Sequence, residues 1–269
     1  MVHAGILIGY IGTLCITAGY HRLWTHKSYK AKLPLRIFYM IGSCINGQND
    51  IYVWVRDHRM HHKYVDTDAD PHSIQRGFFF AHMGWLMCKK HPDVIEKGKT
   101  IDMSDILADP VVRFQRRYYK ILMPLFCFVI PILISVYLLN ESFYMSFCAM
   151  GVARYLLTLH GTWTVNSFAH LVGYQPFDTT QKAHDNLFVS FIGLGEGWHN
   201  YHHVFPWDYS TSELGYYYNY SKVFIDLMAK IGQAYDLRTA TLAQMNRWKN
   251  TKGDGKERWY TVSRPQHKD

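Results

Sequence analysis

The chain has 269 residues and a formal net charge of +8, from 29 lysines and arginines against 21 aspartates and glutamates. Hydrophobic residues make up 48%, enough for a substantial core, and a mean hydropathy of -0.16 excludes a protein buried entirely in lipid. Five scattered cysteines without a C-x-x-C motif argue against a disulfide framework and a zinc knuckle. The basic balance comes with no nucleic-acid-binding motif, so we expect no nucleic-acid partner.

Three segments are predicted to cross a membrane. Residues 1–20 are apolar and long enough, since about 20 residues span a bilayer, and they lack the basic n-region of a signal peptide. Residues 33–55 are apolar but carry polar side chains such as Arg36 and Asp50, so we expect them at the interface or lining a cavity. Residues 121–139 form the strongest span, and residues 143–163 return after the polar break at 140–142.

The distribution of basic residues predicts the orientation. Arg113, Arg116, Arg117 and Lys120 precede the second span, whereas the break at 140–142 carries no basic residue. By the positive-inside rule, residues 21–120 and those after 164 face the cytosol. A single domain that includes the membrane spans is predicted over residues 1–245, followed by a polar, basic tail over 246–269.

Three histidine clusters lie in the parts predicted to share the cytosolic face. They read HRLWTH over residues 21–26, HRMHH over 58–62 and HNYHH over 199–203. In the second and third clusters, spacings of three and four residues place three imidazoles on one helical face. In the first cluster, His21 and His26 would point about 140° apart on an ideal α-helix. That pair converges only if the helix ends there or if the two rings face different metals.

The number of clustered histidines predicts two metal ions. Imidazole binds zinc, copper, iron and nickel, and eight ligands exceed the four that one zinc takes. A two-metal site that activates oxygen favours iron. Soluble di-iron proteins use paired Glu-x-x-His motifs, but Glu196 provides the single match here, so an all-histidine site is favoured. Isolated histidines are interpreted as ordinary polar residues: His3, His72, His82, His91, His160, His184 and His267.

The three clusters, in this order and around a membrane hairpin, resemble the histidine boxes of the animal stearoyl-CoA (delta-9) desaturase family. The resemblance covers roughly residues 5 to 240. It includes the runs VRDHRMHHKYVDTDADPH, TWTVNSFAHLVGYQPFD and GEGWHNYHHVFPWDYSTSE. It implies an all-α, integral membrane protein with a cytosolic helical cap that holds a histidine-rich di-iron site.

The resemblance implies nine histidine ligands for two Fe2+ ions, with no catalytic residue beyond the ligands. One iron would be held by His21, His26, His58, His62 and His202. The other would be held by His61, His170, His199 and His203, with Asn166 nearby through water. Adjacent residues of one box then serve different metals.

The resemblance also implies a substrate path for a fatty acyl-CoA. Residues matching those that hold CoA and pantetheine are Asn49, Arg56, Asp57, Lys89, Lys90 and Trp163. Gln48, Trp54 and Thr162 match the positions that bend the acyl tunnel, and Gly5 and Gly9 fall near its blind end. Bulkier residues there would shorten the tunnel, so we expect an 18-carbon chain to be accepted at least as well as a 16-carbon one.

The implied reaction inserts a cis double bond, at delta-9, into stearoyl-CoA or palmitoyl-CoA. It uses O2 and two electrons from cytochrome b5 and its NADH-dependent reductase, in the endoplasmic reticulum membrane. Family members carry a cytosolic tail and one further span before the segment that starts here at Met1, so we expect that first span to be absent from this sequence. Three alternatives remain: a different regiochemistry such as delta-11, a related di-iron hydroxylase, and a non-catalytic desaturase-like scaffold.

Overall fold

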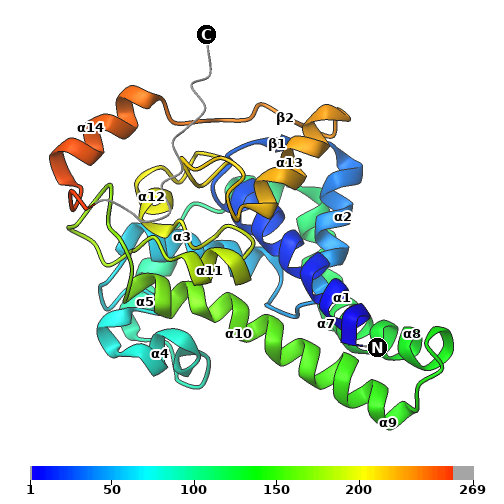
Figure 1. The fold of residues 1–269 in the computed structure, drawn as a ribbon. Helices are drawn as coiled ribbons and strands as arrows, with labels where there is room; N and C mark the ends of the chain where they lie inside the picture. Colours follow the sequence, from blue (N-terminus) through cyan, green and yellow to red (C-terminus); the bar gives the residue numbers. More distant parts are fainter. Residues whose placement is uncertain (1, 257–269) are drawn as a thin grey trace.

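The structure is a computed structural model that describes residues 2–256, and nearly all of its regular structure is helical (Figure 1). The expected all-α class is therefore confirmed. Three long helical runs dominate, and each contains a π-helical segment. They are α1 (Val2–Leu14) with η1 (Cys15–Thr25); α7 (Pro110–Pro124) with η4 (Leu125–Val129) and α8 (Ile130–Leu138); and α9 (Phe143–Ser146) with η5 (Phe147–Ala153) and α10 (Arg154–Ser167).

Two of these runs are long and apolar enough to cross a membrane, namely Val2–Thr25 and Pro110–Leu138. The second run exposes large apolar side chains such as Ile121, Tyr137 and Leu138, which suits contact with lipid. The third predicted span lies within the continuous helix 143–167. Arg154 and His160 make this helix less apolar, so its membrane crossing stays a prediction.

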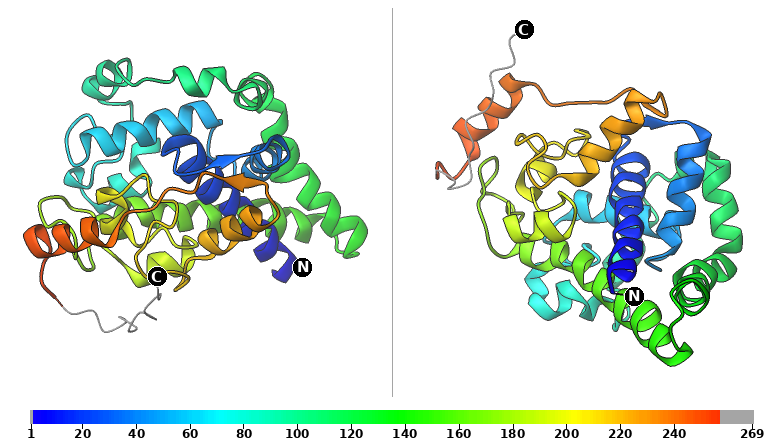
Figure 2. Two further views of the ribbon diagram at one scale, coloured as in Figure 1. Left: turned by 90° about the horizontal axis from the view of Figure 1, so that it is seen from above. Right: turned by 45° about the vertical axis from the view of Figure 1, so that its right-hand side comes forward.

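The first run lies at the centre of the molecule, where α1 contacts α10, and η1 contacts α2, α3 and α13 (Tyr220–Lys230) (Figure 2). Helix α2 (Leu33–Cys44) packs closely on η1, where a Cβ on Gly42 would lie 2.3 Å from Cys15 Sγ. Helix α3 (Ile51–Tyr64) also contacts η1, and Asp50 caps its start by accepting from the N–H of Val53 at 3.0 Å. The segment 33–55 is thus two helices joined by a turn.

Shorter elements make up most of the rest of the described chain. They are η2 (Ile74–Arg76), α4 (Phe78–His82), η3 (Gly84–Leu86), α5 (Pro92–Gly98), α6 (Ser104–Ala108), η6 (Phe168–His170), α11 (Leu187–Ile192), α12 (His199–Val204), α13 (Tyr220–Lys230) and α14 (Leu242–Lys252). The described strands, β1 (Lys30–Ala31) and β2 (Ala234–Tyr235), form a single short antiparallel pair.

The main core lies where η1, α2, α3, α7 and α13 meet. Tyr20, Tyr39, Ile51, Val112 and Ile225 are almost completely buried there. A second, smaller core surrounds Phe177 and Tyr201 and includes Met245 of α14. The predicted tail therefore begins inside a packed helix, and its last residues, 257–269, lie outside the described part of the chain.

Candidate metal centre and cavity

His21 and His26 lie at the end of the first helical run, where the backbone winds as a π-helix. The N–H of His26 donates to the carbonyl oxygen of His21 at 3.2 Å, an i→i+5 hydrogen bond. This wider turn brings the two imidazole rings to 4.8 Å between centroids. The spacing that conflicts with an α-helix is therefore satisfied by a π-turn at the helix end, and both rings join the same group.

The other two clusters lie on the last turns of α3 and along α12. Each cluster divides between two neighbouring groups of imidazoles, because consecutive residues on a helix point in different directions. Within each group the ligand atoms all lie within 4.8 Å of one another. The five-histidine group contains His21, His26, His58, His62 and His202, and the four-histidine group contains His61, His170, His199 and His203.

The ring nitrogens of each group converge on a point. In the five-histidine group, His202 Nε2 lies 2.9 Å from His21 Nε2 and 3.0 Å from His62 Nε2. In the four-histidine group, His199 Nε2 lies 2.9 Å from His170 Nε2 and 3.0 Å from His203 Nε2.

A neutral imidazole has one N–H and one lone pair, so several facing nitrogens cannot all pair with one another. Consistent with this, the Nε2 atoms of His26 and His58 are buried and have no hydrogen-bond partner in the described part of the chain. A cation shared by the converging lone pairs satisfies all of them. Both groups are therefore able to bind a metal ion.

A carboxylate lies within hydrogen-bond distance behind one ligand of each group. Glu196 Oε2 lies 2.7 Å from His21 Nδ1, and both oxygens of Asp70 lie 3.0 Å from His61 Nδ1. A carboxylate on Nδ1 keeps the proton there and directs the Nε2 lone pair to the metal. Glu196 therefore lies outside the ligand set, as the all-histidine interpretation predicts.

The electrostatics keep these groups in the protonation states that metal binding needs. Burial raises the pKa of Glu196, but His21 and Arg22 outweigh it and lower that pKa to about 2. Burial also opposes ionisation of Asp70, yet His61 and His72 bring its pKa below the usual range. Burial, with neighbouring imidazoles, lowers the pKa of seven histidines well below 6.5, namely His26, His58, His62, His170, His199, His202 and His203.

Three cavities lie in series past the histidine groups. The first, of about 220 Å³, is lined by Asn49, Asp57 and Trp163 among others. It shares Trp54, His58, Thr162 and Asn166 with a narrow cavity of about 50 Å³, which His21 and His199 also line. The cavities form a path, because neighbouring cavities share wall residues. The narrow cavity of this path lies directly beside both histidine groups.

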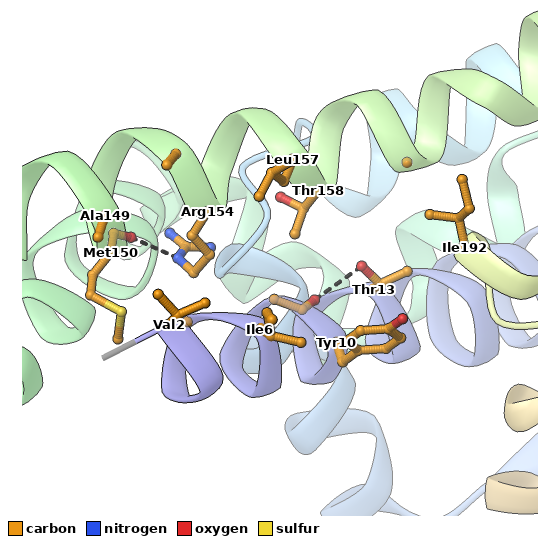
Figure 3. Close-up of a pocket in the computed structure, with 14 residues that line it drawn as sticks. Val2, Ile6, Tyr10, Thr13, Ala149, Met150, Arg154, Leu157, Thr158 and Ile192 are labelled. Carbon is orange, nitrogen blue, oxygen red and sulfur yellow. Dashed lines mark hydrogen bonds between the residues drawn. The ribbon is translucent and has the colours of Figure 1, made fainter.

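The narrow cavity shares Thr13 with the third and largest, of about 380 Å³, between α1 and α10 (Figure 3). Its walls are mostly apolar and include Val2, Ile6 and Leu157. Gly5 and Gly9 line this cavity, which is the one farthest along the path from Asp57.

The residues that resemblance assigns to the tunnel bend lie together. Gln48 Nε2 donates to Thr162 Oγ1 at 2.8 Å, and Trp54 stands against both the first and the narrow cavity. At the other end, Asp57 forms ion pairs with Arg56 at 2.9 Å and with Lys90 at 2.6 Å. Lys89 is exposed on the surface beside Lys90. Asn166 lines two of the cavities, beside both histidine groups.

His72, interpreted from the sequence as an ordinary polar residue, is buried beside the four-histidine group. Its ring is buried 4.5 Å from that of His61, it lines the first cavity, and its Nδ1 lies 3.7 Å from Asp70 Oδ1. By contrast, His82 Nε2 lies 3.0 Å from His160 Nδ1, and neither residue belongs to either histidine group. The sequence signal for Asp70 and His72 is their position in the loop that follows the second box. His267 lies outside the described residues.

The fold and site define a helical membrane protein with two adjacent histidine groups able to bind metal, beside three cavities that share wall residues. The Fatty acid desaturase family model matches residues 1–236. The chain belongs to the fatty acid desaturase family, as its motifs predict.

Several relatives support this at high identity. The chain is 52% identical over 251 residues to an acyl-CoA Delta-9 desaturase of Acheta domesticus, covering 93% of this chain and 70% of that protein. It is 52% identical over 242 residues to stearoyl-CoA desaturase 5 of Bos taurus, covering 90% and 72%. It is 51% identical over 252 residues to stearoyl-CoA desaturase 4 of Mus musculus, covering 93% and 71%. The chain is thus a member of the acyl-CoA delta-9 and stearoyl-CoA desaturase group.

Proposed function

We propose that this chain inserts a cis double bond at the delta-9 position of a saturated fatty acyl-CoA, using O2 and two electrons. The observation that carries the proposal is the row of three cavities that share wall residues and pass beside both histidine groups. The names of relatives from insect and mammals agree with this activity.

The two histidine groups are proposed to hold two Fe2+ ions, five ligands at one and four at the other, with Asn166 acting through water. When bound, the irons would supply the O2-dependent oxidation that an unactivated methylene requires. The protein's own contribution is to keep the imidazoles neutral and to aim them. Burial of the imidazole groups also keeps water away from the reacting carbon.

The cavity lined by Asn49, Asp57 and Trp163 is proposed to hold the pantetheine part of the substrate. Arg56 and Lys90 lie beside its wall, and Lys89 is exposed near them. These cations suit the phosphates of CoA, which would compete with Asp57 for them.

The acyl chain would pass the bend at Gln48, Trp54 and Thr162 and end in the apolar cavity at Gly5 and Gly9. Binding cannot distinguish one methylene from the next, so selectivity rests on holding the whole chain in a fixed register. The large third cavity supports the expectation that an 18-carbon chain is accepted at least as well as a 16-carbon one.

Electrons are proposed to come from cytochrome b5 and its NADH-dependent reductase, and the protein is proposed to reside in the endoplasmic reticulum membrane with its metal site facing the cytosol. The position of the histidine clusters after the first span and outside the 121–163 hairpin supports a common aqueous face.

The test is expression in yeast that lacks its own desaturase. We expect the wild type to restore growth without added unsaturated fatty acid and to produce delta-9 monoenes. The His61→Ala variant, expressed to the same level, should do neither. A hydroxylated product would indicate the hydroxylase alternative, and failure of both proteins to restore growth or form monoenes would indicate a scaffold.

A further inference from the structure

The two histidine groups differ in the charge that surrounds them. Glu196 is the carboxylate beside the five-histidine group, at His21. The four-histidine group has two carboxylates from one loop, Asp70 at His61 and Asp66 at His170. The group with fewer imidazoles therefore has more carboxylates behind its ligands.

The charge of Glu196 is balanced by Arg22. The guanidinium of Arg22 is completely buried and donates to Glu196 Oε1 through Nε at 3.1 Å and through Nη2 at 2.9 Å. Arg22 also donates to the carbonyl oxygen of Tyr209 at 2.8 Å, which fixes the pair in place. The five-histidine group thus sees an ion pair with no net charge.

The carboxylates of Asp70 and Asp66 have no such partner. In the described part of the chain, neither forms an ion pair with a lysine or an arginine. Asp70 accepts from the backbone N–H groups of His72 at 3.1 Å and Asp66 at 3.2 Å. Asp66 Oδ2 accepts from the backbone N–H of Lys182 at 2.9 Å, while its Oδ1 lies 3.9 Å from His170 Nδ1.

A divalent cation held by neutral imidazoles alone leaves two positive charges in a buried site. An anion on the outer nitrogen of a ligand raises the basicity of that ligand and attracts the cation directly, most strongly where water is excluded. A fifth imidazole donates a further lone pair to the metal. With four imidazoles, the metal depends more on the outer anions.

We propose that Asp70, assisted by Asp66, is the charge partner that holds the metal of the four-histidine group, and that the five-histidine group holds its metal without a net outer charge. This rests on the proposed function, because it assumes that both groups bind iron. Asp70 and Asp66 are positioning residues, since they act through His61 and His170.

The primary test compares Asp70→Asn with Asp68→Asn in the purified full chain loaded with Fe2+ without oxygen. Asparagine keeps the shape of Asp70 but removes its charge. Asp68 is exposed on the same loop, so its variant removes an equal charge away from the site. We expect Asp70→Asn to weaken iron binding about 10–100-fold at one of the two sites. Under dialysis against a weak chelator it should lose half of its iron, while Asp68→Asn retains as much as the wild type.

A second readout separates this role from support of the loop. A purely structural role would lower the unfolding temperature equally with and without iron. The proposed role instead reduces the rise in unfolding temperature that iron causes. Asp66→Asn provides a milder variant, because asparagine tolerates the positive φ of 62° at this position. Its iron loss should be smaller, because Asp66 lies farther from His170 than Asp70 does from His61. If Asp70→Asn does not fold, the Asp66→Asn variant provides the test in its place.

The proposal is overturned if Asp70→Asn, or Asp66→Asn in its place, keeps all of its iron and the full iron-induced rise in unfolding temperature. It is equally overturned if Asp68→Asn loses as much iron as the site variants. A wild-type chain that binds no iron would instead reject the proposed function.

Discussion

Gly9 faces Thr158 across the narrow side of the third cavity, where α1 approaches α10. A Cβ on Gly9 would lie 2.8 Å from Thr158 Cγ2, closer than two carbons can pack. Gly9→Ala should therefore either push α1 from α10 or protrude into the cavity. We expect it to lower activity on stearoyl-CoA more than on palmitoyl-CoA, measured with both substrates in microsomes.

The double variant Gly9→Ala/Thr158→Ser is the matched control. Serine removes the clashing Cγ2 and keeps the hydroxyl that donates to the carbonyl oxygen of Tyr155 at 2.9 Å. It should recover most of the preference for the longer chain. An unchanged substrate ratio in Gly9→Ala would show that the acyl chain does not reach this cavity.

At this scale the residues alone predicted part of the site. Their pattern identified eight clustered histidines and two metals, and the family resemblance supplied His170 and the division into two groups. The placement of His72 beside His61 depends on how the loop after α3 folds back, and the pairing of Arg22 with Glu196 joins segments far apart in sequence. Such contacts leave no periodic pattern, so the sequence could not distinguish buried His72 from a surface histidine.

At the scale of elements, one buried glutamine forms hydrogen bonds between the second helical run and the core. Gln115 of α7 is fully buried, donates to Tyr20 Oη at 2.7 Å and to the carbonyl oxygen of Met40 at 3.1 Å, and accepts from the N–H of Ile51 at 2.9 Å. It thus connects α7 with η1, α2 and the start of α3.

Gln115→Leu should strongly destabilise the protein, because each buried polar group left without a partner costs about 1–3 kcal/mol. Thermal unfolding in detergent measures the effect against Gln75→Leu, which changes an exposed glutamine of η2. We expect a clear drop in unfolding temperature for the first variant alone. Equal unfolding temperatures would mean that α7 is not held by this residue.

The helical runs were easier to predict than their internal geometry. Apolar composition is a local property, so residues 1–20 and 121–139 were recognised as helices of membrane-spanning length. The π-helical turns were not predicted, because they depend on packing of the finished fold. The turn at Cys15–Thr25 is the one that matters for function, since it brings His26 beside His21.

For the whole molecule, the depressed histidine pKa values predict a pH-dependent stability of the metal-free protein. In the unfolded chain these imidazoles take up protons near pH 6.5, whereas in the folded protein burial keeps them neutral well below that pH. Stability is therefore fully present above pH 6.5 and falls as the pH drops below it.

Thermal unfolding of the metal-free chain between pH 7.5 and pH 5.5 measures this effect. The unfolding temperature should be nearly constant above pH 6.5 and decline below it, and bound metal should reduce the decline because it competes with protons for the same nitrogens. A metal-free protein that gains stability on acidification would contradict the burial of these rings.

The central claim is that a path running from the CoA end past the metals fixes the reacting carbon. The position of the double bond in products made from palmitoyl-CoA and stearoyl-CoA tests it most directly. If the chain is positioned from its thioester end, both products carry the cis double bond at the same carbon counted from that end, at delta-9. A double bond that keeps a constant distance from the methyl end would contradict the account.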